Sequence, residues 1–444
     1  MPTVQIALIQ EALFHTDDLI MRELNMGTSH ATLLYLETMC DSAKIETSLL
    51  KPLQREHMDF PQSEPRIEEL LTAVKVQHCR SVQEAVDALL QGSALIRSEA
   101  DNLCVSFNAG KENTRTPNEP ENERSLGGNR DGFVEHLQTN LNLIRKHLSS
   151  GDIRVKYFKL GKNANRATAL IWLDGAADQQ VVNEAAERIA ALSSTHDLHP
   201  GLIRKQLREN KYSIFPQTFN TERVDFAAAL LARGRIGVIC DQSSSCLILP
   251  ASIYTFMLTV DDLIQGTWPS LLMRLVRVVG LLFGLMLPSF YIAIVGFNYE
   301  VLPFKMAFSI KSSLENVPYQ PIVETMLMIF IFQLIAEATL RLPSALAQMT
   351  GIVGGIIISE ALVQIGFVSN ILIVIIALTT IGKFVIPSME LRSTTTIAQF
   401  TLIFGATILG FYGIAFALIG ILIHMLALEP FGVPYCLPIR SAKS

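Results

Sequence analysis

The chain has 444 residues, of which 50% are hydrophobic and 17% charged, with a formal net charge of −5 at pH 7. The charged fraction is below the roughly 25% of an ordinary soluble domain, and the slightly acidic balance argues against a nucleic-acid partner. Charges are mixed up to about Pro269 and sparse after Arg277. The composition therefore predicts a soluble half followed by a membrane half.

Neither enzymatic chemistry nor a metal site is indicated by any motif. The chain has no GxSxG, HExxH or GxGxxG sequence, and its six cysteines show neither a CxxC pair nor the spacing of a zinc site. The cysteines are interpreted as reduced, mostly buried thiols. The first residues carry no basic region before an apolar run, so no secretory signal is expected. We predict no catalytic residue, no metal and no cofactor.

Two stretches of the soluble half repeat each other. Residues 18–41 resemble 152–178, which carry a three-residue insertion, and 81–107 resemble 222–249. Each copy reads as an alternating strand, a turn, an apolar strand, and later a short helix that ends at a glycine, followed by two strands. This repeat predicts two homologous α/β subdomains, each a small mixed sheet with helices on it.

Domain boundaries follow from the same pattern. The polar segment between the two copies contains Pro, Gly and Asn without an apolar period, which is typical of a linker or mobile loop. The predicted units are a first cytoplasmic subdomain, a linker, a second cytoplasmic subdomain and a transmembrane helical domain, at 1–107, 108–130, 131–269 and 270–444.

Apolar windows of about 20 residues predict four or five membrane crossings in the last part. Arg274 and Arg277 precede the first window, so the positive-inside tendency places the soluble half in the cytoplasm. The side on which the C-terminus lies is left open. The windows are 278–297, 322–340, 347–368, 371–386 and 397–428.

Several polar residues lie within these windows. Glu337 and Arg341 have the i, i+4 spacing of a local ion pair. Lys383 is near a helix end and is expected to extend toward the membrane surface. Glu324 is close to the start of its predicted helix, where the helix dipole favours an acid. These four residues have ordinary structural explanations.

Glu360 is less easily explained, because it lies near the middle of its window, with Gln364 one turn further on. A carboxylate at this depth requires a partner or water. The same segment carries small residues every four positions, which permit close helix packing: Ala347, Gly351, Gly355 and Ser359.

Two interpretations of this segment remain open. The helix belongs to an ordinary bundle within one chain, with Glu360 paired inside it, most plausibly with Lys383. Alternatively, copies of the helix pack on the small residues around an axis, and a pore is lined by Glu360, Gln364, Val353, Ile356 and Ile357.

Several ordered motifs resemble the GerA family of spore germination receptors, A subunit. They are LPSFYIAIVGFNYEVLP (287–303), LRLPSALAQMTGIVGG (340–355), GFVSNILIVIIALTTIGKFVIPSMEL (366–391) and FGVPY (431–435) in the membrane half, and GNRDGFVEHLQTNLNLIRKHL (128–148) and SIFPQTFNTERVD (213–225) in the soluble half. The resemblance runs from about Asn129 to the C-terminus.

The resemblance implies an integral protein of the spore inner membrane. It would act with a transporter-like B subunit that binds the nutrient and a lipoprotein C subunit. Copies of the A subunit would assemble, as a pentamer, into a channel that nutrient opens to monovalent cations. The chain departs from the family pattern by having Glu360 before Gln364 rather than the reverse order, and DQSSSC at 241–246.

Three function classes follow from these observations. The preferred one is a subunit of a nutrient receptor that forms a gated cation channel. The alternative is a non-conducting scaffold whose soluble subdomains assemble the receptor complex. A secondary transporter is disfavoured, because the membrane half shows no inverted repeat.

Overall fold

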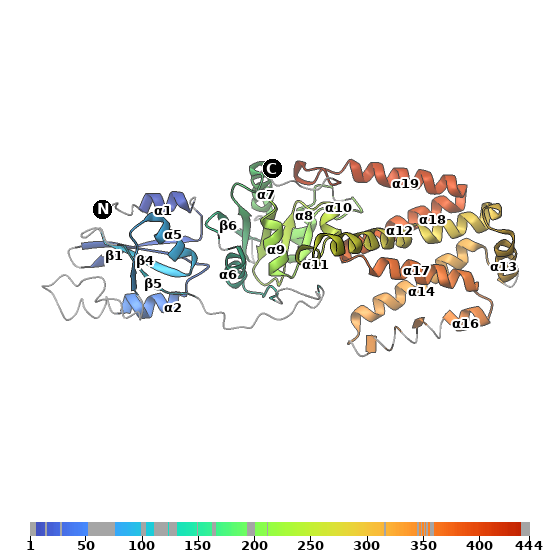
Figure 1. Cartoon of the computed structure of the whole chain (residues 1–444), viewed down its shortest axis with the longest axis horizontal. Helices are drawn as coiled ribbons and strands as arrows, with labels where there is room; N and C mark the ends of the chain where they lie inside the picture. Colours follow the sequence, from blue (N-terminus) through green and yellow to red (C-terminus); the bar gives the residue numbers. More distant parts are fainter. Residues whose placement is uncertain are drawn as a thin grey trace.

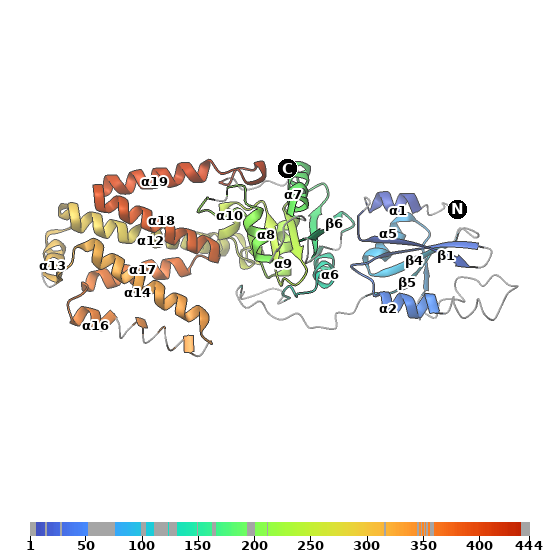
Figure 2. The ribbon, with the colours of Figure 1, turned by 180° about the vertical axis from the view of Figure 1, so that it is seen from behind.

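The structure is a computed structural model that describes residues 6–13, 16–26, 29–51, 76–98, 104–110, 123, 131–148, 150–161, 166–192, 200–210, 212–314, 317–343, 346–347, 349, 351, 354–355 and 359–436. Three regions follow one another along the longest axis: a first α/β subdomain, a second α/β subdomain and a set of helices (Figure 1). The view from behind shows the same order (Figure 2). The predicted fold class, two similar α/β subdomains followed by apolar helices, is confirmed.

The first subdomain is a five-stranded sheet in the order β1-β2-β4-β5-β3. Because side chains alternate along a strand, Leu33 and Leu34 of β2 enter different cores on opposite faces. One face is covered by α2, and the other by α1 and α5 (Figure 1). The elements are α1 (Ile6–Ala12), β1 (Leu19–Met26), β2 (Ser29–Leu36), α2 (Ser42–Ile45) with a π-helical turn (Glu46–Leu50), β3 (Val76–His78), α5 (Val82–Leu90), β4 (Ser93–Ser98) and β5 (Cys104–Asn108).

The second subdomain repeats this topology strand for strand, in the order β6-β7-β9-β10-β8. One face packs against α6 and α9 and the other against α7 and α8. The elements are α6 (Leu137–Leu148), β6 (Ile153–Leu160), β7 (Arg166–Leu173), α7 (Gln179–Ala191), α8 (Pro200–Gln206), β8 (Phe219–Thr221), α9 (Val224–Leu231), β9 (Ile236–Cys240), β10 (Cys246–Leu249), α10 (Ile253–Met257) and α11 (Asp261–Ile264).

The internal repeat of the sequence corresponds to this repeated topology. β2 and β7 hold the same place in their sheets, and the short helices α5 and α9 lead to Gly92 and Gly234, whose φ angles are +82° and +85°. Met26 pairs with Ser29, whereas Leu160 pairs with Arg166, so the second hairpin has the longer connection. This difference is the three-residue insertion seen in the sequence.

The prediction of mixed sheets is wrong, because every strand pair in both sheets is antiparallel. In each subdomain a strand, a helix and a second strand do form a crossover of parallel strands, β3-α5-β4 and β8-α9-β9. A later strand, β5 or β10, inserts between the two. The parallel strands are therefore never neighbours, as in other split β-α-β units.

Among the described residues of the helical region, two helices are long and apolar enough to cross a membrane, α12 and the Pro321–Thr339 part of α14. The helices α17 and α19 are apolar but shorter. The number of crossings stays a prediction. The helices are α12 (Thr267–Phe297), α13 (Phe304–Leu314), α14 (Pro321–Arg341), α16 (Ser359–Gln364), α17 (Asn370–Phe384), α18 (Met389–Leu409) and α19 (Phe411–Leu426).

Two predicted windows differ from the observed helices. The first helix begins at Thr267 rather than at 278, so Arg274 and Arg277 lie inside it. The window 397–428 is not one helix: Gly410, with φ +59°, separates α18 from α19, and the two helices pack side by side (Figures 1 and 2). A glycine adopts this backbone angle without the strain a side chain brings. Part of the window 347–368, including positions 352–353 and 356–358, lies outside the described residues.

Within one chain, α12 and α17 pack closely through glycines that the sequence analysis did not single out. Gly280 and Gly284 on α12 are spaced as GxxxG and face Gly382 on α17. A Cβ on Gly382 would lie 3.1 Å from the backbone nitrogen of Gly284. Small residues let the backbones of α12 and α17 approach each other.

Candidate functional site

The residues predicted to line a pore are only partly described. Glu360 and Gln364 lie on α16, and both side chains are exposed. Gln364 Nε2 donates a hydrogen bond to Glu360 Oε1 at 3.2 Å, which is the one-turn contact that their spacing permits. The other three predicted pore residues lie outside the described residues: Val353, Ile356 and Ile357.

The two glycines of the small-residue stripe have no packing neighbour within the described part of this chain. A Cβ on Gly351 or Gly355 would meet nothing within 4 Å there. The neighbouring Gly354, which is not part of the stripe, faces Ile335 of α14 instead, with a Cβ distance of 2.8 Å. Ala347 is half-buried, and the side chain of Ser359 lies outside the description. Helix α14 therefore packs against the side of the segment that carries Gly354, next to the stripe.

Two polar residues of the predicted membrane windows, Glu337 and Lys383, have specific partners in the structure. Arg341 Nη2 lies 2.6 Å from Glu337 Oε1 in an exposed i, i+4 ion pair. Lys383 donates to Gln399 and, at 3.2 Å, to the hydroxyl of Thr396, both on α18. The amine of Lys383 therefore satisfies its hydrogen bonds inside the bundle, and the carboxylate of Glu360 is bonded elsewhere.

Glu324 occupies a buried polar junction that sequence reasoning missed. Its side chain is fully buried and accepts hydrogen bonds from the backbone N–H of Ser369 and, at 3.3 Å, from the hydroxyl of Tyr291. Ser369 also caps the first turn of α17. One carboxylate thus joins α12, α14 and α17, which no spacing in the sequence reveals because the three residues are far apart along the chain.

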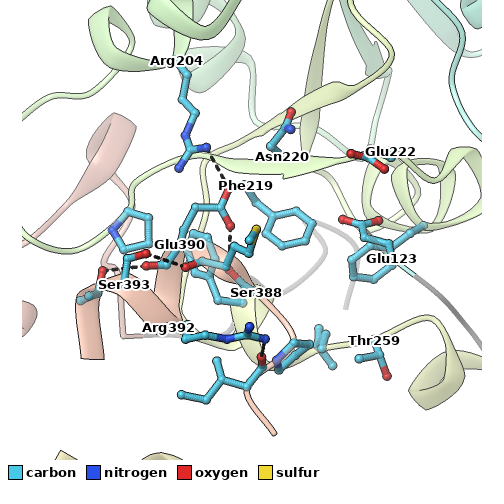
Figure 3. A pocket seen from close by; sticks show the side chains of 18 of the residues that line it. Glu123, Arg204, Phe219, Asn220, Glu222, Thr259, Ser388, Glu390, Arg392 and Ser393 are labelled. Carbon is cyan, nitrogen blue, oxygen red and sulfur yellow. Dashed lines mark hydrogen bonds and ion pairs between the residues drawn. The ribbon is translucent and has the colours of Figure 1, made fainter. Parts of the chain in front are cut away.

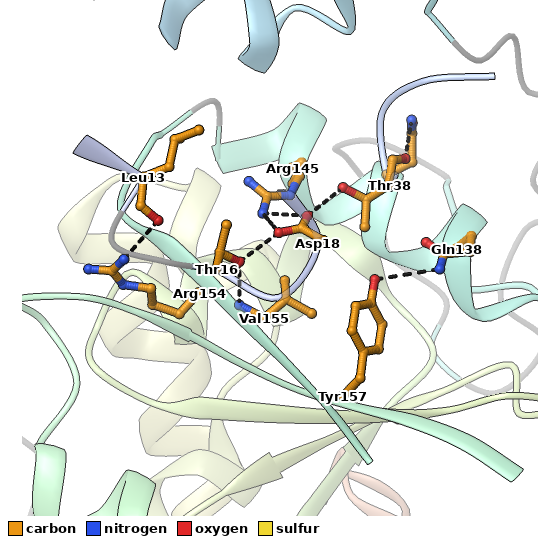
Figure 4. Close-up of polar contacts among 10 residues, drawn as sticks. Leu13, Thr16, Asp18, Thr38, Gln138, Arg145, Arg154, Val155 and Tyr157 are labelled. Atoms are coloured by element: carbon orange, nitrogen blue, oxygen red, sulfur yellow. Dashed lines mark hydrogen bonds and ion pairs between the residues drawn. The ribbon is translucent and has the colours of Figure 1, made fainter. Parts of the chain in front are cut away.

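A second junction fastens the two subdomains to each other. Asp18 is fully buried and receives two hydrogen bonds from Arg145 Nη2, at 2.9 and 2.7 Å (Figure 4). The hydroxyls of Thr16 and Thr38 donate to the same carboxylate at 2.6 and 2.7 Å. Arg154 adds a contact to the carbonyl oxygen of Leu13 at 2.9 Å. A buried charge satisfied in this way holds a defined geometry between the subdomains.

A polar recess lies where the second subdomain meets the helices. It is a cavity of about 870 Å³ between the soluble segments that contain α8, β8 and α9 and the turn that joins α17 to α18. Arg204 pairs with Glu390 across this boundary at 2.9 Å, and the hydroxyl of Ser388 donates to Glu390 at 2.7 Å (Figure 3). The volume is within the range of small-molecule sites.

The cavity also contains an acid whose pKa is shifted. Glu123 accepts a hydrogen bond from the hydroxyl of Thr221 at 2.6 Å. Burial raises the pKa of Glu123 to about 7, against the lowering effect of that hydrogen bond. Desolvation disfavours the charged carboxylate, so the site would favour a cation or a proton next to it.

Further contacts couple the soluble half to the helices. Arg277 on α12 forms an ion pair with the buried Asp262 and donates to the carbonyl oxygen of Met257 at 3.0 Å. Ser213 contacts His424 Nε2 on α19 at 3.0 Å. One hydrophobic core of the second subdomain also contains residues of the helical region: Ile386, Leu391, Leu428 and Tyr435. Movement in one half is therefore opposed by contacts with the other.

Comparisons with known proteins identify the family. The profile described as Bacillus/Clostridium GerA spore germination protein matches residues 7–444. "Spore germination protein B1" of Bacillus subtilis (strain 168) is 30% identical over 98% of this chain and 90% of its own length. "Spore germination protein KA" of the same strain is 30% identical over 99% and 82%, respectively. The chain belongs to the GerA family of spore germination proteins.

Two more similar proteins extend the comparison. "Spore germination protein GerLA" of Bacillus cereus is 29% identical over 98% of this chain and 89% of its own length. The crystal structure of the N-terminal domain of the A subunit of the Bacillus megaterium spore germinant receptor GerK3 matches with a TM-score of 0.41 and 22% identity, covering 55% of this chain and 92% of that domain. The named relatives are spore germination proteins, and the family assignment indicates a role in germination.

Proposed function

We propose that this chain is the A subunit of a nutrient receptor in the spore inner membrane and that several copies, as in a pentamer, assemble into a nutrient-gated channel for monovalent cations. The soluble half lies in the cytoplasm. The receptor includes a transporter-like B subunit and a lipoprotein C subunit. The family match over nearly the whole chain supports the receptor role.

One observation carries the channel part of the proposal. The exposed Glu360 and Gln364 lie in the same segment as Gly351 and Gly355, whose Cβ positions meet nothing in the described part of one chain. A second copy packing on these glycines would bring a carboxylate from each copy close to a shared axis. A ring of carboxylates attracts cations and repels anions.

The test combines assembly with ion flux. The purified chain in liposomes is assayed for potassium flux, and Glu360→Gln is expected to lower that flux roughly tenfold because the attractive charge is lost. Glu337→Gln is the matched control, since it removes an exposed acid that is paired locally with Arg341. Normal flux in a well-assembled Glu360→Gln protein would exclude the pore role of this residue.

The same glycines provide the assembly test. Gly351→Leu and Gly355→Leu should reduce the oligomer measured by light scattering in detergent, because a leucine keeps helix backbones apart. Gly420→Leu on α19 is the control, since a Cβ there also meets nothing within 4 Å. Assembly without flux in the unaltered chain would favour the alternative function, a non-conducting scaffold of the receptor.

A further inference from the structure

The cavity between the second subdomain and the α17–α18 turn has an opening that is suited to an amphiphile. Its helical wall includes Phe384, Met389 and Ile397. Met389 and Ile397 begin an exposed apolar ridge on one face of α18 that continues through Phe404 and Ile408, which are 67% and 56% exposed. In the bilayer proposed above, this ridge lies against lipid chains, and it ends at a polar cavity.

One end of the cavity carries an excess of positive charge. Arg204 and Arg208 line it together with one carboxylate, Glu390, which is paired with Arg204. Arg392 also lines the cavity, on the helical wall beyond Glu390 (Figure 3). In the part of the chain that the structure describes, Nε of Arg208 and Nε of Arg392 have no hydrogen-bond partner. Burial and the neighbouring Arg204 lower the pKa of Arg208. A bound anion would relieve this repulsion, and guanidinium groups match phosphate geometry.

The opposite end is acidic. Figure 3 shows Glu123 and Glu222 across the cavity from Arg204 and Arg392, and Asp261 lines the cavity as well. The arginine at this end, Arg223, is engaged by Asp225 through two hydrogen bonds at 3.0 and 2.7 Å. A ligand that carries an anion and a cation a few bonds apart would complement both ends of the cavity.

We propose that this cavity binds the headgroup of a zwitterionic phospholipid of the phosphoethanolamine type. The phosphate lies at Arg208, the ammonium group lies toward Glu123, and the acyl chains follow the ridge of α18. The inference rests on the proposed membrane location. A lipid bound in this way contacts both the soluble half and the helices, beside the Arg204–Glu390 pair.

Native mass spectrometry of the purified full chain in detergent tests the binding. Three lipids with identical oleoyl chains are titrated: phosphatidylethanolamine, phosphatidylglycerol, which keeps the phosphate but lacks the ammonium group, and dioleoylglycerol, which lacks both. Phosphatidylethanolamine should bind about tenfold more tightly than phosphatidylglycerol, which corresponds to one charge-assisted contact, and dioleoylglycerol should bind least. Equal retention of all three lipids overturns the proposal.

Two variants test which end of the cavity binds the phosphate and which end binds the ammonium group. Arg208→Gln should weaken binding of both phospholipids about tenfold. Glu123→Gln should weaken phosphatidylethanolamine alone, to the level of phosphatidylglycerol, a selective change that a folding defect would not produce. Arg274→Gln is the matched control, because Arg274 is a half-exposed arginine at the start of α12, outside the cavity. Unchanged binding by both cavity variants overturns the assignment.

A soluble competitor distinguishes a lipid from a free headgroup. Glycerophosphoethanolamine carries the same charges without acyl chains and should displace the lipid only at far higher concentration. Displacement at equal concentration overturns the lipid as the ligand. Binding is measured without ion flux, so a chain that binds lipid but conducts no cations contradicts only the proposed channel. A chain that conducts but fails these titrations contradicts only this inference.

Discussion

The two α/β subdomains share a strand order but differ in what packs against them. The cores of the first are built from its own residues. Both cores of the second also contain side chains from the helical region or the turn after α19, Leu428 and Tyr435 in one and Phe431 in the other. The second subdomain therefore joins two neighbours: the first subdomain, through Asp18 and Arg145, and the helices. A repeated backbone specifies the shape of each unit, whereas a few surface side chains decide its position in the molecule.

The largest expected effect comes from breaking the buried ion pair between the subdomains. Asp18→Asn removes the charge that balances Arg145, whose side chain is 3% exposed. Leaving one buried partner uncompensated costs about 3–5 kcal/mol. Denaturant unfolding of the purified variant should show the first subdomain detaching from the second at a lower denaturant concentration than in the unaltered chain. Limited proteolysis should also separate the two subdomains earlier.

An exposed ion pair in the first subdomain is the control. Glu46 and Lys51 lie 3.6 Å apart and both side chains are more than half exposed. Glu46→Gln should change the unfolding midpoint little, because an exposed pair contributes about 0–1 kcal/mol. Equal effects of Asp18→Asn and Glu46→Gln would show that the buried pair does not hold the subdomains together.

Gly92 and Gly234 hold equivalent places in the two subdomains, so the same substitution can be compared at both. Gly92→Ala and Gly234→Ala both place a side chain at a positive φ, which costs roughly 1–2 kcal/mol. At Gly234 the new Cβ also overlaps the carbonyl oxygen of Ala176, whereas at Gly92 the nearest atoms are 3.2 Å away. We expect the loss of unfolding free energy to be larger for Gly234→Ala. A larger loss for Gly92→Ala would contradict this ranking.

The smallest expected effect is that of removing the hydroxyl of Tyr435, a residue that attaches the helical region to the second subdomain. Tyr435 is buried between Phe215 and Phe256, with ring centroids 5.9 and 6.5 Å away. Its hydroxyl has no hydrogen-bond partner among the residues that the structure describes. Tyr435→Phe should therefore leave thermal stability unchanged or raise it by up to about 1 kcal/mol, whereas Tyr435→Ala should lower it by about 3–5 kcal/mol. A marked loss in Tyr435→Phe would indicate a polar role.

Sequence reasoning was most effective where the signal was local or repeated. The repeat predicted two similar subdomains and equivalent places for β2 and β7, because hydrophobic alternation and turn glycines are properties of neighbouring residues. It did not reveal that β5 and β10 insert between parallel strands, since the choice of neighbour depends on side chains distant along the chain. The break at Gly410 was missed for a related reason: both flanking helices are apolar, and a single glycine interrupts no periodicity.

The features of the candidate site likewise fall into those that the sequence predicts and those that appear only in the folded chain. The sequence alone determined the family, the apolar helices and the presence of acids among them, because motifs and composition need no folded partner. Only the tertiary structure decided that Glu324 joins three helices, that Lys383 bonds to α18, and that Arg204, Arg208 and Arg392 meet at one cavity. Electrostatic and hydrogen-bonding energies act over a few ångströms, and residues distant along the chain come within that range only after the chain has folded.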